Sequence, residues 1–371
     1  MPSITLRVVT KRFGKFVAVD QVDLDIQDGA FVTLLGPSGC GKTTTLRMIA
    51  GLESPDEGEI IIDGKTVFSS ERGIDVPPDK RDVGFLFQNY ALWPHMTVEK
   101  NISFGIENLK WDSARIKARV AELLATLKIE QFSKRYPSEL SGGQQQRVAI
   151  ARTLATAPRV LLMDEPLSNL DAKLRTEMRT ELKRLHVETG STFVYVTHDQ
   201  LEAMTLSTRT CLMKEGRVQQ YAPPLEIYNE PANIFVADFV GNPTMNFIAG
   251  TVRSVDLDSI KIEAAAMSLS FTPGSGSVTL GEDQTVVLGV RPEYLRIGTG
   301  GAIGAMVYST LPSGMETIVK IKVGEQFLTS VVFGAIDFLV NEAVSFDFIG
   351  NRCVLFDAES GRRLASGNLE T

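Results

Sequence analysis

The sequence predicts an α/β fold for roughly the first two-thirds of the chain and a separate all-β domain for the remainder. Short continuous apolar runs alternate with helical patterns up to about residue 240, and short alternating runs without helical periodicity follow. A chain of 371 residues is also long enough to form two hydrophobic cores. We therefore expect two domains, residues 1–240 and residues 241–371.

The predicted strands of the first domain differ in how deeply they should be buried. Phe31–Leu35, Val160–Met163 and Thr192–Val196 are continuous apolar runs, as expected for strands covered on both faces. Ile4–Val9 and Val22–Ile26 alternate apolar and polar residues, which is typical of edge strands. Both kinds of strand occur among helical patterns, so the combination indicates an α/β architecture.

A longer helical stretch interrupts the alternation of strands and helices. From Thr97 onwards, apolar residues recur at spacings of three and four, which is the period of an amphipathic helix. They include Ile116, Val120, Leu123, Leu124 and Leu127. We assign about residues 89–155 to a helical subdomain inserted into the first domain.

The pattern of apolar residues changes after about Asn242. Thr317–Val323 reads T-I-V-K-I-K-V, and Thr285–Val290 and Val344–Phe348 have a similar pattern. Glycine and other turn residues separate these short runs. Several short strands at close spacing predict a small all-β barrel or sandwich.

Composition excludes several classes of protein. The net charge of −7 argues against a general nucleic-acid binder, which usually carries a basic excess. No apolar run approaches the roughly 20 residues needed to cross a bilayer, and residues 1–16 lack the apolar core of a signal peptide. The three cysteines are far apart and fit no metal-ligand spacing, so we expect reduced thiols.

A glycine-rich loop follows the predicted buried strand Phe31–Leu35 and precedes a helical run, Thr44–Ala50. Glycines let successive backbone N–H groups turn towards phosphate oxygens, and the helix N-terminus adds a favourable dipole. Lys42 would supply charge to the β- and γ-phosphates, and the Thr43 hydroxyl could ligate Mg²⁺. The alternative is a simple glycine-rich turn. The predicted nucleotide-binding residues are Gly36, Pro37, Ser38, Gly39, Cys40, Gly41, Lys42, Thr43 and Thr44.

Two carboxylates end the apolar run Val160–Met163. Asp164 is placed to hold the hydration shell of Mg²⁺, and Glu165 is placed to polarise an attacking water. An acidic pair at a strand end is, by itself, more often a helix N-terminus or a solvated turn. A phosphate-binding loop on a neighbouring parallel strand favours the catalytic interpretation, and the adjacent glutamate indicates a hydrolase.

A second glycine nest, Leu140-Ser141-Gly142-Gly143-Gln144, precedes the helical pattern Gln145–Leu154. Two glycines and a serine at a helix start form an anion-binding nest. The chain already has one phosphate-binding loop, so we expect this nest to close over ATP held by another copy of the chain. The alternative is a glycine-rich N-cap.

With these motifs, the sequence resembles the nucleotide-binding subunits of ATP-binding-cassette transporters over essentially its whole length. By this resemblance, Gln88 corresponds to the glutamine that touches Mg²⁺ and couples to the membrane subunit. Asp171, in the segment Ser168–Asp171, corresponds to the loop at the dimer seam. His198 corresponds to the histidine that contacts the γ-phosphate, and Phe13 to the aromatic residue that stacks on adenine.

The resemblance implies a complete hydrolysis centre built from two protomers of a homodimer. Glu165, His198 and Gln88 would be catalytic, and Mg²⁺, the cofactor, would be bound by Thr43, Gln88 and Asp164. The residues that would contact ATP in trans are Ser141, Gly142, Gly143, Gln144 and Asp171.

The resemblance also implies partners and a location. Tyr90–Val98, after Gln88, resembles the start of the groove that receives a helix from each of two transmembrane permease subunits. The C-terminal region is similar to the OB-like regulatory domain of maltose-importer ATPases. We therefore expect a peripheral protein at the cytoplasmic face of the cell membrane, served indirectly by a solute-binding protein.

The cargo is not decided by these motifs. We expect a sugar or sugar derivative, with glycerol-phosphate, polyamine, iron and phosphonate importers as neighbouring possibilities. A soluble cassette ATPase that acts on nucleic acid or ribosomes is the competing class. Such proteins insert long coiled coils or carry two cassettes in tandem, and this acidic chain shows neither. A third possibility is that the β-rich tail senses a ligand and makes the chain mainly regulatory.

Overall fold

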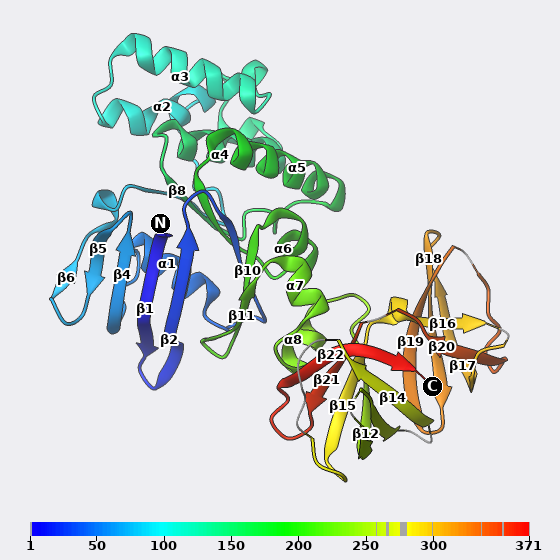
Figure 1. Ribbon diagram of the computed structural model, residues 1–371. Coiled ribbons are helices and arrows are strands. Elements are labelled where there is room, and N and C mark those ends of the chain that lie inside the picture. The colour runs from blue at the N-terminus through cyan, green and yellow to red at the C-terminus, as the bar shows by residue number, and fades with distance from the viewer. Residues whose placement is uncertain are drawn as a thin grey trace. The chain divides into compact units, whose positions relative to one another are not determined.

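A computed structural model describes residues 2–370 except 257, 265–266, 275–279, 299, 335 and 351. The chain forms two compact units, Met1–Pro224 and Leu225–Thr371. This division falls earlier than the predicted limit at residues 240/241, because the short helices α7 (Pro224–Asn229) and α8 (Ile234–Phe239) group with the second unit rather than with the first. Figure 1 shows both units.

A six-stranded sheet in the order β11-β10-β3-β9-β8-β7 forms the centre of the first unit. The strands are β3 (Phe31–Leu35), β7 (Val83–Leu86), β8 (Val160–Asp164), β9 (Thr192–Val196), β10 (Arg209–Lys214) and β11 (Arg217–Ala222). All pairs from β10 to β7 are parallel, and β11 is an antiparallel edge strand. The three predicted buried strands are therefore neighbours in the middle of one sheet.

Alternate residues of these strands belong to two different hydrophobic cores. On β9, Phe193 and Tyr195 pack with helices of the helical subdomain, whereas Val194 and Val196 pack with helix α1 (Lys42–Ala50). All five residues of β9 are buried, so both faces of the sheet are covered. A strand buried on both faces needs a continuous apolar run, which explains the pattern seen in the sequence.

A second, antiparallel sheet in the order β2-β1-β4-β5-β6 shares a core with α1. Its strands are β1 (Pro2–Phe13), β2 (Phe16–Gln27), β4 (Glu57–Ile62), β5 (Lys65–Ser69) and β6 (Ile74–Asp75). Helix α1 contacts β2 on one side and β8 and β9 on the other. The helix that follows the glycine-rich loop is therefore clamped between two sheets.

The helices α2 (Val98–Asn108), α3 (Ser113–Thr126) and α4 (Gly142–Ala155) lie within the predicted helical subdomain. They contact one another, and α2 and α3 form the outermost layer of this unit in Figure 1. Helices α5 (Ala172–Thr189) and α6 (Gln200–Leu206) follow strands β8 and β9. Short 3₁₀ turns at Pro78–Lys80, Glu130–Phe132 and Pro137–Glu139 complete the unit.

The second unit contains a closed barrel in the order β12-β13-β14-β22-β21-β15. A further five-stranded antiparallel sheet, β16-β20-β17-β18-β19, lies in the same unit. The predicted fold class, an α/β nucleotide-binding domain plus an all-β OB-like barrel, is confirmed. The second sheet was not predicted, because alternation identifies strands but does not tell which of them pair. The strands are β12 (Asn246–Val255), β13 (Ile260–Ala264), β14 (Met267–Pro273), β15 (Thr285–Val290), β16 (Leu295–Gly298), β17 (Ile303–Pro312), β18 (Glu316–Val323), β19 (Gln326–Phe333), β20 (Ala343–Phe348), β21 (Cys353–Asp357) and β22 (Arg363–Glu370).

Candidate functional site

Four loops with polar residues meet at one edge of the parallel sheet. The strands β3, β9, β8 and β7 are adjacent and parallel, so their carboxyl ends lie side by side. The glycine-rich loop follows β3, His198 follows β9, Asp164 ends β8, and Gln88 follows β7. In open α/β sheets, ligands bind outside the carboxyl ends of the strands.

The glycine-rich loop requires glycine at two positions, because each has a positive φ angle and a backbone carbonyl oxygen close to where a Cβ atom would lie. At Gly36 the φ angle is +148°, and a Cβ atom would lie 2.2 Å from the carbonyl oxygen of Met213. At Gly41, the residue before α1, φ is +101° and a Cβ atom would lie 2.4 Å from the carbonyl oxygen of Ala18. The loop can therefore wind tightly over the sheet edge only without side chains at these positions.

Lys42 is buried at the start of α1, although lysine is rarely buried without a partner. Its Nζ donates hydrogen bonds to the carbonyl oxygens of Gly36 at 2.7 Å and Pro37 at 2.9 Å. Cys40 Sγ lies 3.7 Å from the same nitrogen. The ammonium group is thus held inside the curve of the loop, at the N-terminus of a helix, where an anion is favoured.

Thr43 and Asp164 connect the glycine-rich loop to the end of β8. Thr43 Oγ1 donates a hydrogen bond of 2.8 Å to Asp164 Oδ1, and Arg47 Nη2 lies 3.7 Å from Asp164 Oδ2. Burial raises the pKa of the Asp164 carboxyl above its ordinary value, and the Thr43 hydrogen bond offsets this in part. A buried carboxylate beside a hydroxyl favours a hard cation with oxygen ligands.

Glu165 has a strained backbone. Its φ angle is +45°, a left-handed conformation that costs a residue with a side chain about 1–2 kcal/mol. The Glu165 N–H donates to Val196 O at 3.1 Å, and Ser168 Oγ donates to Glu165 O at 2.8 Å. These bonds hold the strained turn, and Glu165 Oε2 lies 3.3 Å from Nδ1 of the largely exposed His198. Strain of this kind clusters at functional sites.

Gln88 forms hydrogen bonds with the loop that follows Glu165. Its Nε2 donates to Ser168 Oγ at 3.4 Å, and Asn169 Nδ2 donates to the Gln88 carbonyl oxygen at 3.2 Å. The Gln88 side chain is exposed, and it is linked to Glu165 through Ser168. The loops after β7 and β8 are therefore connected next to the two carboxylates.

A cavity of about 260 Å³ lies over the glycine-rich loop. Its lining residues are Phe13, Phe16, Ala18, Ser38, Gly39, Cys40, Gly41, Lys42, Thr43, Thr44 and Glu165. Of these, Phe16 and Ala18 were not predicted from the sequence. The signal available in the sequence was a second aromatic residue, Phe16, on the other side of Gly14 from Phe13.

The second glycine nest lies elsewhere. Among the described residues that line the cavity, none comes from residues 141–144, and Asp171 is also absent. Ser141 and Gln144 form a reciprocal capping box at the start of α4, and Ser141 is exposed. A Cβ atom at Gly143 would lie 2.4 Å from the Leu174 side chain of α5. Asp171 caps α5 by accepting a hydrogen bond from Leu174 N at 3.0 Å.

A parallel sheet with a phosphate-binding loop, an adjacent acidic pair and an inserted helical subdomain defines a P-loop nucleoside triphosphatase. The ABC transporter family profile matches residues 19–168, and the MalK OB fold domain profile matches residues 241–295. The trehalose/maltose import ATP-binding protein MalK of Thermococcus litoralis is 43% identical over 377 residues, 98% of this chain and 100% of that protein. The spermidine/putrescine import ATP-binding protein PotA of Rubrobacter xylanophilus is 50% identical over 325 residues, 85% of this chain and 82% of that protein.

Solved structures give the same picture for the cassette. CbiO1 of Clostridium perfringens, part of an ABC transporter complex, is 29% identical with a TM-score of 0.57, covering 62% of this chain and 91% of that one. A dimeric ATP-binding cassette in a post-hydrolysis state with ADP and Pi is 36% identical with a TM-score of 0.52, covering 60% and 98%. The chain belongs to the ABC transporter family, among the importer ATP-binding proteins with a MalK-type OB-fold domain. The predicted activity, ATP hydrolysis coupled to solute translocation, is thereby confirmed.

Proposed function

We propose that two copies of this chain bind two ATP molecules between them and power the uptake of a sugar or sugar derivative. One observation carries the first part of this proposal. The phosphate-binding loop, Asp164, Glu165 and His198 follow neighbouring parallel strands at one sheet edge, whereas the second glycine nest, at Ser141, begins helix α4 and is not among the described residues that line the cavity over that loop. Ser141 and Gly142 of this nest are exposed on one protomer, which leaves them free to cap the nucleotide of the other.

Each side chain at the sheet edge has a different role in ATP hydrolysis. Lys42 exchanges its two loop carbonyls for phosphate oxygens, and the loop N–H groups bind the same phosphates. Glu165 orients the attacking water and accepts its proton. His198, 3.3 Å from Glu165, contacts the γ-phosphate from the neighbouring loop. Gln88 connects this centre to the helical subdomain.

The residues present fit a magnesium ion. The candidate ligands are a hydroxyl, a carboxylate and an amide oxygen, and oxygen atoms of this kind suit a hard cation. Thr43 and Asp164 are already 2.8 Å apart, and Gln88 is the third candidate. These residues would hold the ion, which would supply positive charge to the phosphates of bound ATP.

We assign the docking of two permease subunits to the segment Tyr90–Val98. Arg152 of α4 donates hydrogen bonds to Ala91 O at 2.6 Å and Tyr90 O at 2.7 Å, and its guanidinium lies over the Trp93 ring. These contacts fix the segment while Pro94 and His95 remain exposed. No helix among the described residues is long and apolar enough to cross a bilayer. Docking to the permeases through Tyr90–Val98 would hold the chain at the cytoplasmic face of the membrane.

Similarity over the full length supports sugar as the solute class. The Thermococcus litoralis trehalose/maltose protein aligns with nearly all of this chain, including the barrel. A polyamine is the second candidate, because the Rubrobacter xylanophilus spermidine/putrescine protein has the higher identity over a shorter alignment. Co-purification of the tagged chain with its permeases and binding protein, followed by thermal shift of that binding protein with sugars and with spermidine, separates the two.

The dimer is tested with Glu165→Gln, which should bind ATP without turning it over. We expect this variant to elute as a stable ATP-bound dimer on gel filtration. Lys42→Ala is the matched control and should not hydrolyse ATP; turnover near the wild-type rate would contradict the assignment of the phosphate-binding loop. A Glu165→Gln protein that binds ATP but stays monomeric refutes the shared-site proposal.

A further inference from the structure

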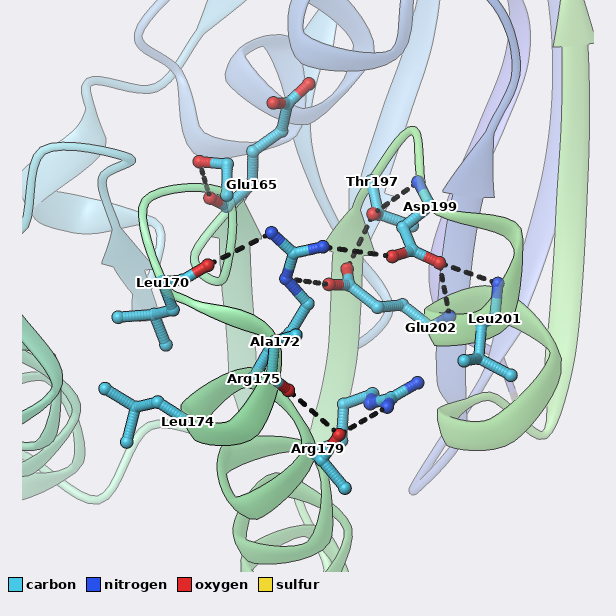
Figure 2. Close-up of polar contacts among 12 residues, drawn as sticks. Glu165, Leu170, Ala172, Leu174, Arg175, Arg179, Thr197, Asp199, Leu201 and Glu202 are labelled. Atoms are coloured by element: carbon cyan, nitrogen blue, oxygen red, sulfur yellow. Dashed lines mark hydrogen bonds and ion pairs between the residues drawn. The ribbon is translucent and has the colours of Figure 1, made fainter. Parts of the chain in front are cut away.

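We infer that Arg175, on the first turn of α5, is a positioning residue that joins the loop before α5 to the loop that carries His198. The inference rests on the proposed function, because it assigns the control of His198 in that reaction. Figure 2 shows the Arg175 guanidinium lying between the carbonyl oxygen of Leu170 and the carboxylates of Asp199 and Glu202. None of these residues lines the cavity over the phosphate-binding loop.

One guanidinium contacts both loops. Arg175 Nη2 donates a hydrogen bond of 3.1 Å to Leu170 O, in the loop that leads to Asp171. Arg175 Nη1 lies 3.4 Å from Asp199 Oδ2, and Arg175 Nε lies 3.9 Å from Glu202 Oε1. Arginine suits this place because its three nitrogens are held in one planar fork, which can face several acceptors at once.

Glu202, one of the two carboxylates that face Arg175, is held inside the protein. Glu202 is buried, and its Oε2 accepts hydrogen bonds from Tyr195 at 2.7 Å and from Thr197 at 2.6 Å. Burial raises the pKa of the Glu202 carboxyl, and the bonds from Thr197 and Tyr195 offset this in part. Glu202 is therefore a fixed point between strand β9 and helix α6, and not a mobile surface carboxylate.

This anchor holds the backbone on both sides of His198. Thr197 Oγ1 donates to Glu202 and accepts from the N–H of Asp199 at 2.9 Å. Asp199 in turn caps α6 by accepting from Leu201 N and Glu202 N. His198 itself has an exposed side chain, and its Nδ1 lies 3.3 Å from Glu165. The position of this imidazole therefore depends on residues 197 and 199, which Arg175 and Glu202 hold.

The geometry gives Arg175 a specific task in a dimeric ATPase. The loop from Ser168 to Asp171 is the segment assigned to the dimer seam. The Arg175 guanidinium contacts Leu170 O in this loop and also the Asp199 carboxylate, next to His198. A shift of that loop when the partner closes is transmitted to the histidine. ATP binding uses the phosphate-binding loop, so loss of Arg175 should affect turnover more than nucleotide affinity.

The test compares Arg175→Lys and Arg175→Ala with Arg179→Ala as the matched control. Arg179 lies one turn further along α5, where it hydrogen-bonds Thr176 on the same helix. Lysine keeps the positive charge, so the protein should fold, but one ammonium cannot face Leu170, Asp199 and Glu202 together. Circular dichroism and thermal melting establish that each variant is folded, and ATPase kinetics are then measured with full-length protein.

We expect kcat to fall about 10- to 100-fold in Arg175→Ala, as for a misplaced catalytic group. The fall should be smaller in Arg175→Lys, and KM for ATP should change less than about threefold in both. Arg179→Ala should match the wild type. Adding Arg175→Ala to Glu165→Gln should leave the ATP-dependent dimer intact.

The outcomes separate this inference from the proposed function. If both folded Arg175 variants retain wild-type kcat while His198→Ala is inactive, the positioning role is wrong and the proposed site stands. If Arg175→Ala and Arg175→Lys instead raise KM with unchanged kcat, Arg175 acts in binding and the inference also fails. An active His198→Ala protein would overturn the assignment of the histidine itself.

Discussion

Replacing Tyr195 by Phe removes one hydroxyl from the interior of the first unit. Tyr195 is fully buried on β9, and its hydroxyl donates a 2.7 Å hydrogen bond to the buried Glu202. The ring contacts with Phe31 and the surrounding core are kept in the variant. The substitution therefore tests the hydrogen bond almost alone.

The magnitude follows from the burial of both groups. A hydrogen bond to a charged group contributes about 1.5–3 kcal/mol, and its loss leaves Glu202 with Thr197 as its remaining close donor. In a unit of this size a loss of about 2 kcal/mol lowers the melting temperature by roughly 4–8 °C. Thermal melting followed by circular dichroism, with the first unfolding transition analysed separately from that of the second unit, measures this change.

The loss should depend on pH in a definite direction. Burial raises the pKa of Glu202 in the folded protein above its value in the unfolded chain, so ionisation of Glu202 opposes folding as pH rises. Removing the Tyr195 bond raises that pKa further, because the bond favours the charged form. The destabilisation is therefore largest at neutral pH and shrinks when acid protonates Glu202 in both proteins.

Tyr221→Phe is the matched control. The Tyr221 hydroxyl is buried in the same unit and has no hydrogen-bond partner among the described residues. Removing an unpartnered buried hydroxyl should cost nothing or stabilise the protein slightly. If the two variants lose the same stability, or if Tyr195→Phe loses equally at neutral and acidic pH, then Glu202 is not a buried charge held by Tyr195.

Three further substitutions, two of them paired with a comparison variant, test the nucleotide site. Asp164→Asn should raise the melting temperature without nucleotide at neutral pH, since burial raises the pKa of this carboxyl, and the gain should fade in acid. It should also abolish the stabilisation by ATP and Mg²⁺, about 2.7 kcal/mol at a hundredfold excess over Kd; retained stabilisation contradicts the metal assignment. Gly36→Ala should prevent ATP binding and destabilise by more than about 3 kcal/mol, whereas Gly39→Ala, with no atom within 4 Å, costs less in the same melts. Phe13→Ala should raise KM for ATP about tenfold with kcat unchanged; a larger rise in Phe16→Ala would move adenine stacking to that residue.

Much of the first unit could be predicted because its signals are local. The continuous apolar runs at β3, β8 and β9 match strands buried on both faces. The glycine-rich loop between β3 and α1 needs its glycines for local backbone reasons, as the φ angles at Gly36 and Gly41 show. Strand type, helix caps and loop conformation each depend on residues that are close together in the sequence.

The parts that were missed depend on pairing over long distances. Phe16 and Ala18 line the cavity only because the β1–β2 hairpin lies over the phosphate-binding loop. Alternation identified strands of the second unit, but the five-stranded sheet beside the barrel depends on which strands hydrogen-bond. Alternation of apolar and polar residues shows which face of a strand is buried, but it does not show which other strand pairs with it.

The sequence by itself determined the type of reaction, because residue types at fixed spacing identify a phosphate-binding loop, an acidic strand end and a second glycine nest. Only the tertiary structure decided that β3, β9, β8 and β7 are neighbours, which brings Lys42, His198 and Glu165 to one edge. It also decided that Arg175 reaches two loops and that Leu174 closes over Gly143. The physical reason is that backbone conformation and burial are recorded locally, whereas the meeting of distant side chains is fixed by strand order and core packing.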